Sequence, residues 1–184
     1  MSKIIIGLAG ELAAGKGSVS DYLVEAHNAS RFGYSDSLRA ALAIFDLEIS
    51  RENLQKFSTV LRGAFGENLL EKAILREVNN SKALICVIDG IRRMSDVTEF
   101  VKMDNFYLVA VTADPKIRYE RIVLRKQNTG EDKLTFEDFM KQHEAETEKQ
   151  IEEVISNAKF KIINDRDLSS LHMQIEEVLK QITK

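Results

Sequence analysis

The chain has 184 residues, of which 44% are hydrophobic and 30% are charged, so it can bury the core of one domain but is cramped for two independent ones. Its 26 basic and 29 acidic residues leave a net charge of −3, and no overall positive field draws it to nucleic acid. The single cysteine, Cys86, excludes an internal disulfide framework and a cysteine-based zinc site, and we expect it to be buried in the core.

The amino-terminal sequence runs from Met1 straight into the apolar segment at residues 3–9. This leaves no room for a signal peptide with a cleavage site. No apolar run approaches the length of about 18 residues that a membrane-spanning helix requires. We therefore expect a cytoplasmic protein that binds no membrane.

Short apolar segments rich in β-branched residues predict strands that are buried on both faces of a parallel sheet. They lie at residues 3–9, 31–34, 84–88, 106–112 and 160–163, the second being the weakest. Helical periodicity fills the intervals, with Ser50 and Asp114-Pro115 as helix starts and an amphipathic helix from Leu168 to Ile182. This alternation predicts a doubly wound α/β fold with a five-stranded parallel sheet, in which ligands bind at the carboxyl ends of the strands.

The segment from Ser50 to Asn80 carries no strand signal and shows a helical stripe of apolar residues, with breaks expected near Gly63 and Gly66. We expect this segment to form helices inserted into the β-α alternation, called here the helical excursion. We therefore predict one domain over residues 1–184, with a helical insertion for a phosphate acceptor at about 35–80 and a short lid at about 121–134.

A glycine-rich loop follows the first predicted strand and precedes a helix, which is the context that a Walker A phosphate-binding loop requires. Its backbone N–H groups and the helix N-terminus would surround the phosphates of ATP, and its lysine would reach the β- and γ-phosphates. The predicted ATP-binding residues here are Gly10, Ala13, Ala14, Gly15, Lys16, Gly17 and Ser18. Two positions are irregular, because Gly17 stands where Ser or Thr is usual and Ala13 where Gly is frequent. The Glu11 side chain either turns to solvent or positions the nucleophile or a metal.

Lys16-Gly17-Ser18 resembles the end of the phosphate loop in adenylate kinases, and three later segments extend the likeness in the same order. Residues 35–40 resemble the segment that carries the first acceptor-binding arginine of that family. Residues 87–93 resemble its Asp-Gly-Phe-Pro-Arg segment, and residues 114–125 resemble the helix that enters its lid with an Arg-x-x-x-Arg pair. The resemblance implies a P-loop nucleoside-monophosphate kinase, with Asp36 and Arg39 on the acceptor side.

The carboxyl-terminal part, residues 134–171, is closer to dephospho-CoA kinases and to an archaeal family of adenylate-kinase-related proteins. Residues 126–133 would form a short lid without zinc cysteines, and residues 50–80 depart from the adenylate kinase pattern. These departures leave the identity of the acceptor open.

Charged residues in these segments suit phosphoryl transfer, which needs alignment and charge neutralisation more than covalent chemistry. Asp89, at the end of an apolar run, would hold Mg²⁺ together with Ser18; its alternative is helix capping. Arginine binds phosphate bidentately, so the acceptor candidates are Arg39, Arg62, Arg92 and Arg93. For each the alternative is a structural or surface ion pair.

Arg121 and Arg125 lie one helical turn apart, where they would reach the γ-phosphate or cover the adenine once the lid closes; the alternative is a solvated helix face. Asn164 would line the base pocket. The three histidines lack metal-ligand spacing and are expected to be solvated or satisfied: His27, His143 and His172.

These features predict an ATP- and Mg²⁺-dependent phosphotransferase that moves the γ-phosphate to a nucleoside or deoxynucleoside monophosphate, with Lys16, Asp89, Arg121 and Arg125 as its catalytic residues. The partner is then a small molecule. Two alternatives stay open: a dephospho-CoA kinase, and an adenylate-kinase-like ATPase switch that acts on a protein or RNA partner. The absence of an Asn-Lys-x-Asp motif disfavours a GTPase.

Overall fold

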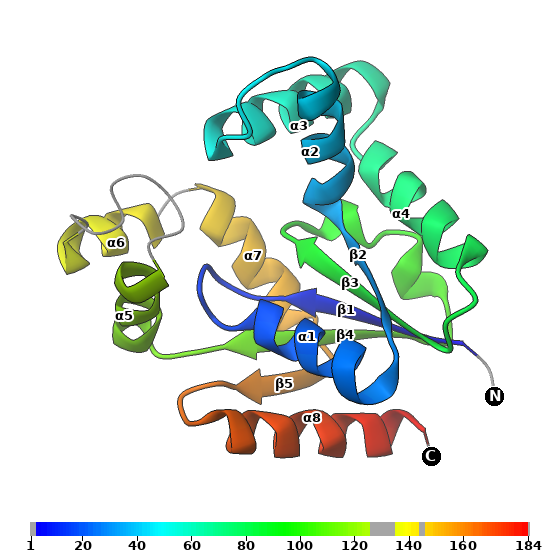
Figure 1. Cartoon of the computed structure of the whole chain (residues 1–184), viewed down its shortest axis with the longest axis vertical. Helices are drawn as coiled ribbons and strands as arrows, with labels where there is room; N and C mark the ends of the chain where they lie inside the picture. The colour runs from blue at the N-terminus through cyan, green and yellow to red at the C-terminus, as the bar shows by residue number, and fades with distance from the viewer. Residues whose placement is uncertain (1–2, 126–134, 144–145, 184) are drawn as a thin grey trace.

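A five-stranded parallel sheet forms the centre of the molecule, with helices on both faces (Figure 1). The computed structural model describes residues 3–125, 135–143 and 146–183. The strands are β1 (Ile4–Ala9), β2 (Ser30–Gly33), β3 (Ile85–Ile91), β4 (Phe106–Thr112) and β5 (Phe160–Ile163). Their order in space is β2-β3-β1-β4-β5, and all neighbours are parallel. The α/β fold predicted from the sequence is therefore confirmed.

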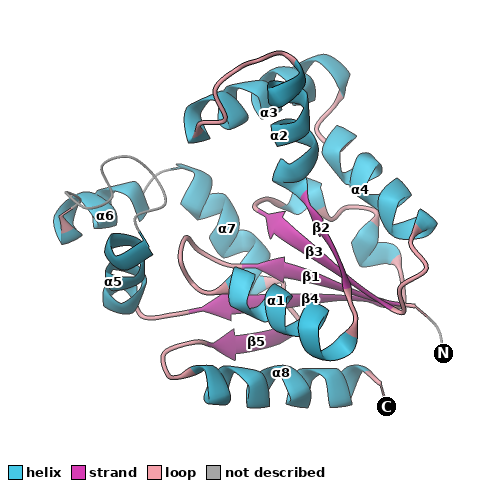
Figure 2. Ribbon diagram, viewed as in Figure 1, coloured by secondary structure: helices cyan, strands magenta, loops and turns pink. Residues whose placement is uncertain are grey.

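Helices connect the strands and form the excursion between β2 and β3 (Figure 2). They are α1 (Lys16–His27), α2 (Tyr34–Ile44), α3 (Arg51–Phe65), α4 (Leu69–Asn80), α5 (Pro115–Arg125), α6 (Phe136–His143), α7 (Glu146–Ser156) and α8 (Leu168–Ile182), with the 3-10 turns η1 (Met94–Asp96) and η2 (Phe100–Lys102). The Ser50 hydroxyl caps α3 by accepting from the Asn53 N–H at 3.2 Å, as predicted. The expected break near Gly63 does not occur: α3 continues to Phe65 and ends at Gly66.

The two faces of the sheet carry separate apolar cores because successive side chains of a strand point in opposite directions. Ile6 and its equivalents pack against α1 and α8. Ile5 and Cys86 pack on the opposite face, where α2, α4 and α7 cover the sheet. Cys86 is fully buried, so its predicted place in the core is confirmed.

Strand β3 is longer than the sequence predicted, because it continues past the apolar run to Ile91. Asp89 therefore lies within the strand, opposite Gly33 of β2, and Ile91 lies opposite Ala9 of β1. The chain leaves β3 directly beside the point where it leaves β1. The segments that follow these two strands therefore begin next to each other.

The lid expected at 121–134 falls mainly on residues 126–134, which lie outside the described ranges. Among the helices that are described, none is both long and apolar enough to cross a membrane.

Candidate functional site

The glycine-rich loop, residues 10–15, packs tightly between β4 and the segment after β5. A Cβ atom on Gly10 would lie 2.2 Å from the carbonyl oxygen of Val111, and one on Gly15 would lie 2.0 Å from Nδ2 of Asn164. Gly15 also has a φ of 104°, a conformation that favours glycine. These two glycines are therefore required by the close approach of neighbouring groups.

The N-terminus of α1 is open toward the loop. Gly15 occupies the cap position and provides no side-chain cap. The positive end of the helix dipole at this position suits an anion. Lys16 Nζ donates to the carbonyl oxygens of Gly10 at 2.6 Å and Glu11 at 3.0 Å. Its ammonium group thus lies over the loop, while Ser18 is exposed on the first turn of α1.

Asn164, which follows the edge strand β5, contacts the same loop, and Arg121 of α5 contacts Asn164. Asn164 is buried, and its Nδ2 donates to the carbonyl of Ala14 at 2.9 Å. Arg121 Nη2 donates to the backbone carbonyl of Asn164 at 2.8 Å, whereas its buried Nη1 finds no hydrogen-bond partner in the described part of the chain. Arg125 ends α5, and its side chain lies outside what the structure describes.

Arg118 is a further residue at the loop, and the sequence analysis missed it. Its side chain is 1% exposed, lies 3.0 Å from the Glu11 carboxylate and donates from Nε to the Ala113 carbonyl at 3.1 Å. The guanidinium also lies 5.4 Å from the centre of the Phe139 ring of α6. Arg118 precedes Arg121 by three residues, so the two share one helix face, and that spacing was the available signal.

Asp89 lies on the sheet face that α1 covers, because it alternates in phase with Val87, a member of that core. Its Oδ2 is 2.8 Å from Nη2 of Arg31, and Arg31 also lies 3.4 Å from Asp21 of α1. Metal-binding clusters of three or more histidine, cysteine or acidic side chains are absent from the described residues. A carboxylate and a hydroxyl are oxygen ligands of the kind that Mg²⁺ takes, and Mg²⁺ is usually held by one or two carboxylates and by substrate phosphates.

Residues 92–96, called here the arginine loop, follow β3 beside the glycine-rich loop. The Arg92 side chain is exposed and that of Arg93 is half-buried, 3.5 Å from the Glu67 carboxylate. Arg39 lies exposed on α2, and no hydrogen bond or ion pair to it is found within the described ranges. The Asp36 carboxylate packs over Gly33, where a Cβ atom would lie 2.4 Å from it.

Arg62 differs from the other predicted acceptor residues because its side chain is buried. Only 5% of it is exposed, and its Nη2 lies 2.6 Å from Oδ1 of Asp96, which is also buried. Its Nη1 donates to the carbonyl of Glu67. This placement favours the structural alternative that the sequence left open, since the guanidinium is occupied by an internal carboxylate. We do not carry Arg62 forward as an acceptor ligand.

Tyr34 completes this buried polar cluster, because its hydroxyl donates to the backbone carbonyl of Asp96. Burial raises the pKa of Tyr34 far above its ordinary value, and the nearby carboxylates of Asp96 and Glu71 act in the same direction. The tyrosine is therefore a neutral donor at any physiological pH.

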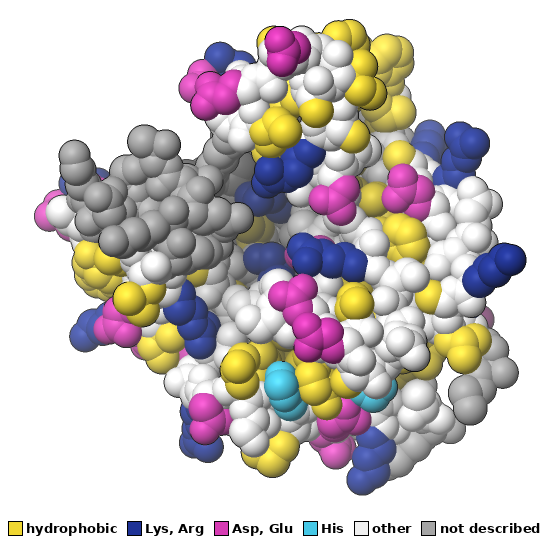
Figure 3. Space-filling model, in the orientation of Figure 1, with side chains coloured by type: hydrophobic (Ala, Val, Ile, Leu, Met, Phe, Trp, Pro, Cys, Tyr) yellow, Lys and Arg dark blue, Asp and Glu magenta, His cyan; other side chains and the backbone are white. Residues whose placement is uncertain are grey.

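The space-filling view shows Lys and Arg side chains gathered around a hollow in the middle of this face, below α2 and α3 (Figure 3). The glycine-rich loop and the arginine loop both emerge at this carboxyl-terminal edge of the sheet. The glycine-rich loop with Lys16, and the start of the arginine loop, are thus brought together at this edge, whereas Arg62 is buried and the Arg125 side chain lies outside the described residues.

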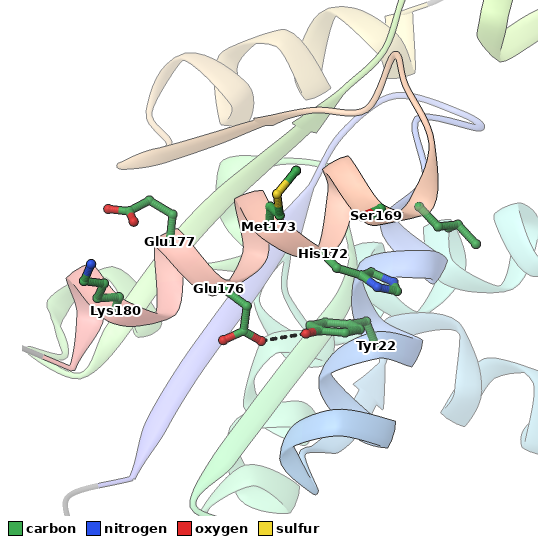
Figure 4. Close-up of a pocket in the computed structure, with 8 residues that line it drawn as sticks. Tyr22, Ser169, His172, Met173, Glu176, Glu177 and Lys180 are labelled. Carbon is green, nitrogen blue, oxygen red and sulfur yellow. Dashed lines mark hydrogen bonds between the residues drawn. The ribbon is translucent and has the colours of Figure 1, made fainter.

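A separate shallow groove lies between α1 and α8 and contains none of the predicted site residues (Figure 4). In it the Tyr22 hydroxyl bonds to Glu176 at 2.7 Å, and the Tyr22 ring stacks on His172 with centres 4.0 Å apart. His27 also bonds to Glu176 at 2.7 Å. These two histidines therefore have partners, as expected; the His143 side chain lies outside the described set.

The family model for the AAA domain matches residues 6–152 of the chain. A UPF0200 protein of Sulfurisphaera tokodaii is 31% identical over 178 residues, which cover 97% of this chain and 97% of that protein. Among solved structures, shikimate kinase from Bacteroides thetaiotaomicron aligns with a TM-score of 0.64 and 14% identity, covering 98% of this chain and 99% of the other. Deoxyadenosine kinase from M. mycoides aligns with a TM-score of 0.54 and 14% identity, covering 98% and 99%.

The two kinase structures share too little sequence to indicate more than the fold, which is that of P-loop small-molecule kinases. The matched domain is a P-loop domain, which implies nucleotide binding. The resemblance to adenylate kinases predicted a P-loop kinase fold, which these comparisons support. The relatives found by sequence are named UPF0200 proteins, not adenylate kinases. By the AAA domain model and by its identity with the Sulfurisphaera protein along nearly its whole length, the chain belongs to the UPF0200 family of P-loop proteins.

Proposed function

We propose that the protein is an ATP-dependent phosphotransferase whose acceptor is the phosphate of a nucleoside or deoxynucleoside monophosphate. The observation that carries this proposal is the register of β1 and β3, in which Ala9 lies opposite Ile91. Because of it, the glycine-rich loop and the arginine loop leave the sheet side by side. Two phosphate-binding elements next to each other suit a reaction that needs two phosphorylated ligands in line.

On the donor side, the glycine-rich loop would hold the β- and γ-phosphates of ATP through its N–H groups and the N-terminus of α1. Lys16 would exchange its two carbonyl acceptors for phosphate oxygens without leaving the loop. The buried Nη1 of Arg121 has no hydrogen-bond partner among the residues that the structure describes. This supports a role for the side chain at the phosphates, since a buried donor without a partner is costly and a bound anion would satisfy it.

Mg²⁺ bound to ATP would neutralise charge on the transferring phosphoryl group. Asp89 and Ser18 are the residues that would hold it, directly or through water. Asp89 is paired with Arg31 at 2.8 Å, so the metal would compete with this guanidinium for the carboxylate. Arg31 in turn keeps Asp21 as a second partner.

On the acceptor side, Arg39, Arg92 and Arg93 are the proposed ligands of the monophosphate, with Asp36 near the start of the same helix. The guanidinium groups of Arg39 and Arg92 are exposed and that of Arg93 is half-buried, and such groups fit a dianionic phosphate. These residues would bind the phosphate and do not indicate which nucleoside the acceptor carries. The two solved kinases are named for different acceptors, shikimate and deoxyadenosine.

The decisive experiment is a coupled ADP-release assay with ATP and Mg²⁺ across nucleoside monophosphates, deoxynucleoside monophosphates, dephospho-CoA and shikimate, together with a reaction that contains no acceptor. We expect release that depends on a monophosphate. Release that depends on dephospho-CoA would instead assign a dephospho-CoA kinase. Release at the same rate without any acceptor would favour the ATPase switch over the kinase.

A further inference from the structure

The buried carboxylate of Asp96 connects the backbone of the arginine loop to α3. Asp96 ends η1, and its side chain is 2% exposed. Oδ2 accepts the backbone N–H groups of Arg92 at 2.9 Å and Arg93 at 3.2 Å, while Oδ1 lies 2.6 Å from Arg62 Nη2. A buried carboxylate is tolerated only when such partners satisfy it.

Arg62 brings the helical excursion into the same network. Its Nε lies 3.3 Å from the Ser58 hydroxyl one turn earlier on α3, and its Nη1 donates to the carbonyl of Glu67 in the connection to α4. The same Glu67 lies 3.5 Å from Arg93 through its carboxylate. The end of α3 and the arginine loop are therefore joined through one buried ion pair.

This network holds the backbone of the arginine loop, while the Arg92 side chain is exposed and that of Arg93 is half-buried beside Glu67. Binding of a phosphate by two guanidinium groups is strongest when their backbone is already fixed, because less conformational entropy is lost on binding. An error of about 1 Å in the placement of such a group can cost on the order of 100-fold in rate.

We propose that Asp96 is a positioning residue for the acceptor: it fixes the backbone of Arg92 and Arg93 and, through Arg62, sets the helical excursion against them. This inference rests on the proposed function, because it assumes that the arginine loop binds the acceptor phosphate. Asp96 itself is buried and does not touch the acceptor.

The test is Asp96→Asn, which keeps the shape of the side chain but leaves one acceptor oxygen where the carboxylate has two. The amide can serve either the two backbone N–H groups or Arg62, not both. We expect the KM for the monophosphate, or its Kd measured by calorimetry with AMP, CMP, GMP and UMP as probes, to rise on the order of 10- to 100-fold. The KM for ATP should stay within a factor of about two, since the glycine-rich loop is untouched.

Glu71→Gln is the matched control, because Glu71 is also a buried carboxylate that accepts two consecutive backbone N–H groups, from Glu99 at 2.6 Å and Phe100 at 3.3 Å. Both bonds go to Oε1, so a glutamine can keep them. Its acceptor KM should match that of the wild type. Hydrogen exchange of the Arg92 and Arg93 amides should be faster in Asp96→Asn and unchanged in Glu71→Gln.

If Asp96→Asn does not fold, the double variant Asp96→Leu/Arg62→Met takes its place, because replacing both partners of a buried ion pair by apolar residues is often tolerated, and leucine cannot accept the Arg92 and Arg93 N–H groups. Unchanged acceptor binding in a folded Asp96 variant, while Arg93→Ala loses acceptor binding, would overturn this inference and leave the kinase proposal standing. A wild-type protein that binds none of the four monophosphates would overturn both. Equal losses of ATP and acceptor binding would reduce Asp96 to a general structural role and also overturn the inference.

Discussion

The Glu11 carboxylate lies 3.0 Å from the guanidinium of Arg118, and this ion pair joins the glycine-rich loop to α5. The Glu11 side chain is 15% exposed and the Arg118 side chain is 1% exposed. Removing one partner of a buried pair leaves the other charge uncompensated. We expect Glu11→Gln to lower the free energy of unfolding by up to about 3 kcal/mol, the lower end of the range for a buried pair, because Glu11 retains some contact with water.

A double-variant cycle with Arg118→Met measures this coupling. Urea unfolding of the two single variants and of the double variant should show that Glu11→Gln costs much less once Arg118 is already methionine. Additive effects would mean that the two side chains act independently, and that Arg118 contributes through its contacts to Leu12, Ala113 and Phe139 instead.

If the glycine-rich loop binds ATP as proposed, Lys16→Ala should abolish turnover while the fold is retained, because the ammonium group, which donates to two carbonyls of the loop, would contact the phosphates. Lys3→Ala is the matched control: Lys3 also donates to two backbone carbonyls, of Val78 at 2.7 Å and Ser81 at 2.8 Å, away from the site. ATP binding by calorimetry and ADP release should fall only in the Lys16 variant. Turnover at the wild-type level in that variant would contradict the assignment of the glycine-rich loop.

Asp89→Ala should lower kcat by orders of magnitude in the presence of Mg²⁺, since charge stabilisation by a metal contributes several kcal/mol to such reactions. Asp21→Ala removes the other carboxylate that pairs with Arg31 and should keep kcat close to the wild-type value. Magnesium titrations of both variants distinguish a metal ligand from an ion-pair partner. Equal turnover in the two variants would assign Asp89 to structure.

Arg39→Ala and Arg93→Ala should each weaken acceptor binding by about 2–5 kcal/mol, the range for truncating one partner of a hydrogen-bonded charge pair, and should barely change ATP binding. Arg76→Ala on α4 removes the same charge from an exposed side chain outside the site and serves as the control. Calorimetry of ATP and of the best acceptor decides the outcome. Equal losses for both ligands, or no loss for the acceptor, would raise the ATPase switch above the kinase.

Stability should also depend on pH through Glu71, because burial raises the pKa of this carboxyl above its usual value of 4.5. Between 4.5 and the raised value the folded state binds more protons than the unfolded chain, so stability falls as the pH rises through this window. Glu71→Gln cannot lose a proton. Its unfolding free energy relative to the wild type should therefore grow more favourable from pH 4.5 to pH 7, and a constant difference would contradict the shift.

The sheet and the glycine-rich loop were predictable because short, contiguous sequence patterns indicate both. Runs of β-branched residues marked β4 and β5 with their bounds, and Gly15-Lys16 between a strand and a helix marked the loop. The end of β3 was missed because Asp89 and Gly90 interrupt the apolar run. Pairing with β2 and β1 extends the strand past them to Ile91, and a local pattern does not contain those partners.

The two buried ion pairs, Arg62–Asp96 and Glu11–Arg118, could not be predicted from the sequence for a related reason. Arg62 and Asp96 are 34 residues apart, and an arginine in a helical segment looks the same whether it faces solvent or an internal carboxylate. Arg118 stood in the segment that resembles adenylate kinases, yet its contact with Glu11 depends on how α5 packs against the loop. Both cases require the tertiary arrangement, because burial decides whether a charge is structural or available to a ligand.

The contact between Gly15 and Asn164 has a consequence for how this protein can change over generations. The amide nitrogen of Asn164 fills the place where a side chain on residue 15 would begin, 2.0 Å from its Cβ position, and the same amide bonds to the carbonyl of Ala14. A larger residue at position 15 is therefore blocked while Asn164 is present, and loss of Asn164 frees a carbonyl of the loop. The two positions, one near each end of the chain, therefore restrict each other, and position 15 is restricted further by the positive φ of Gly15.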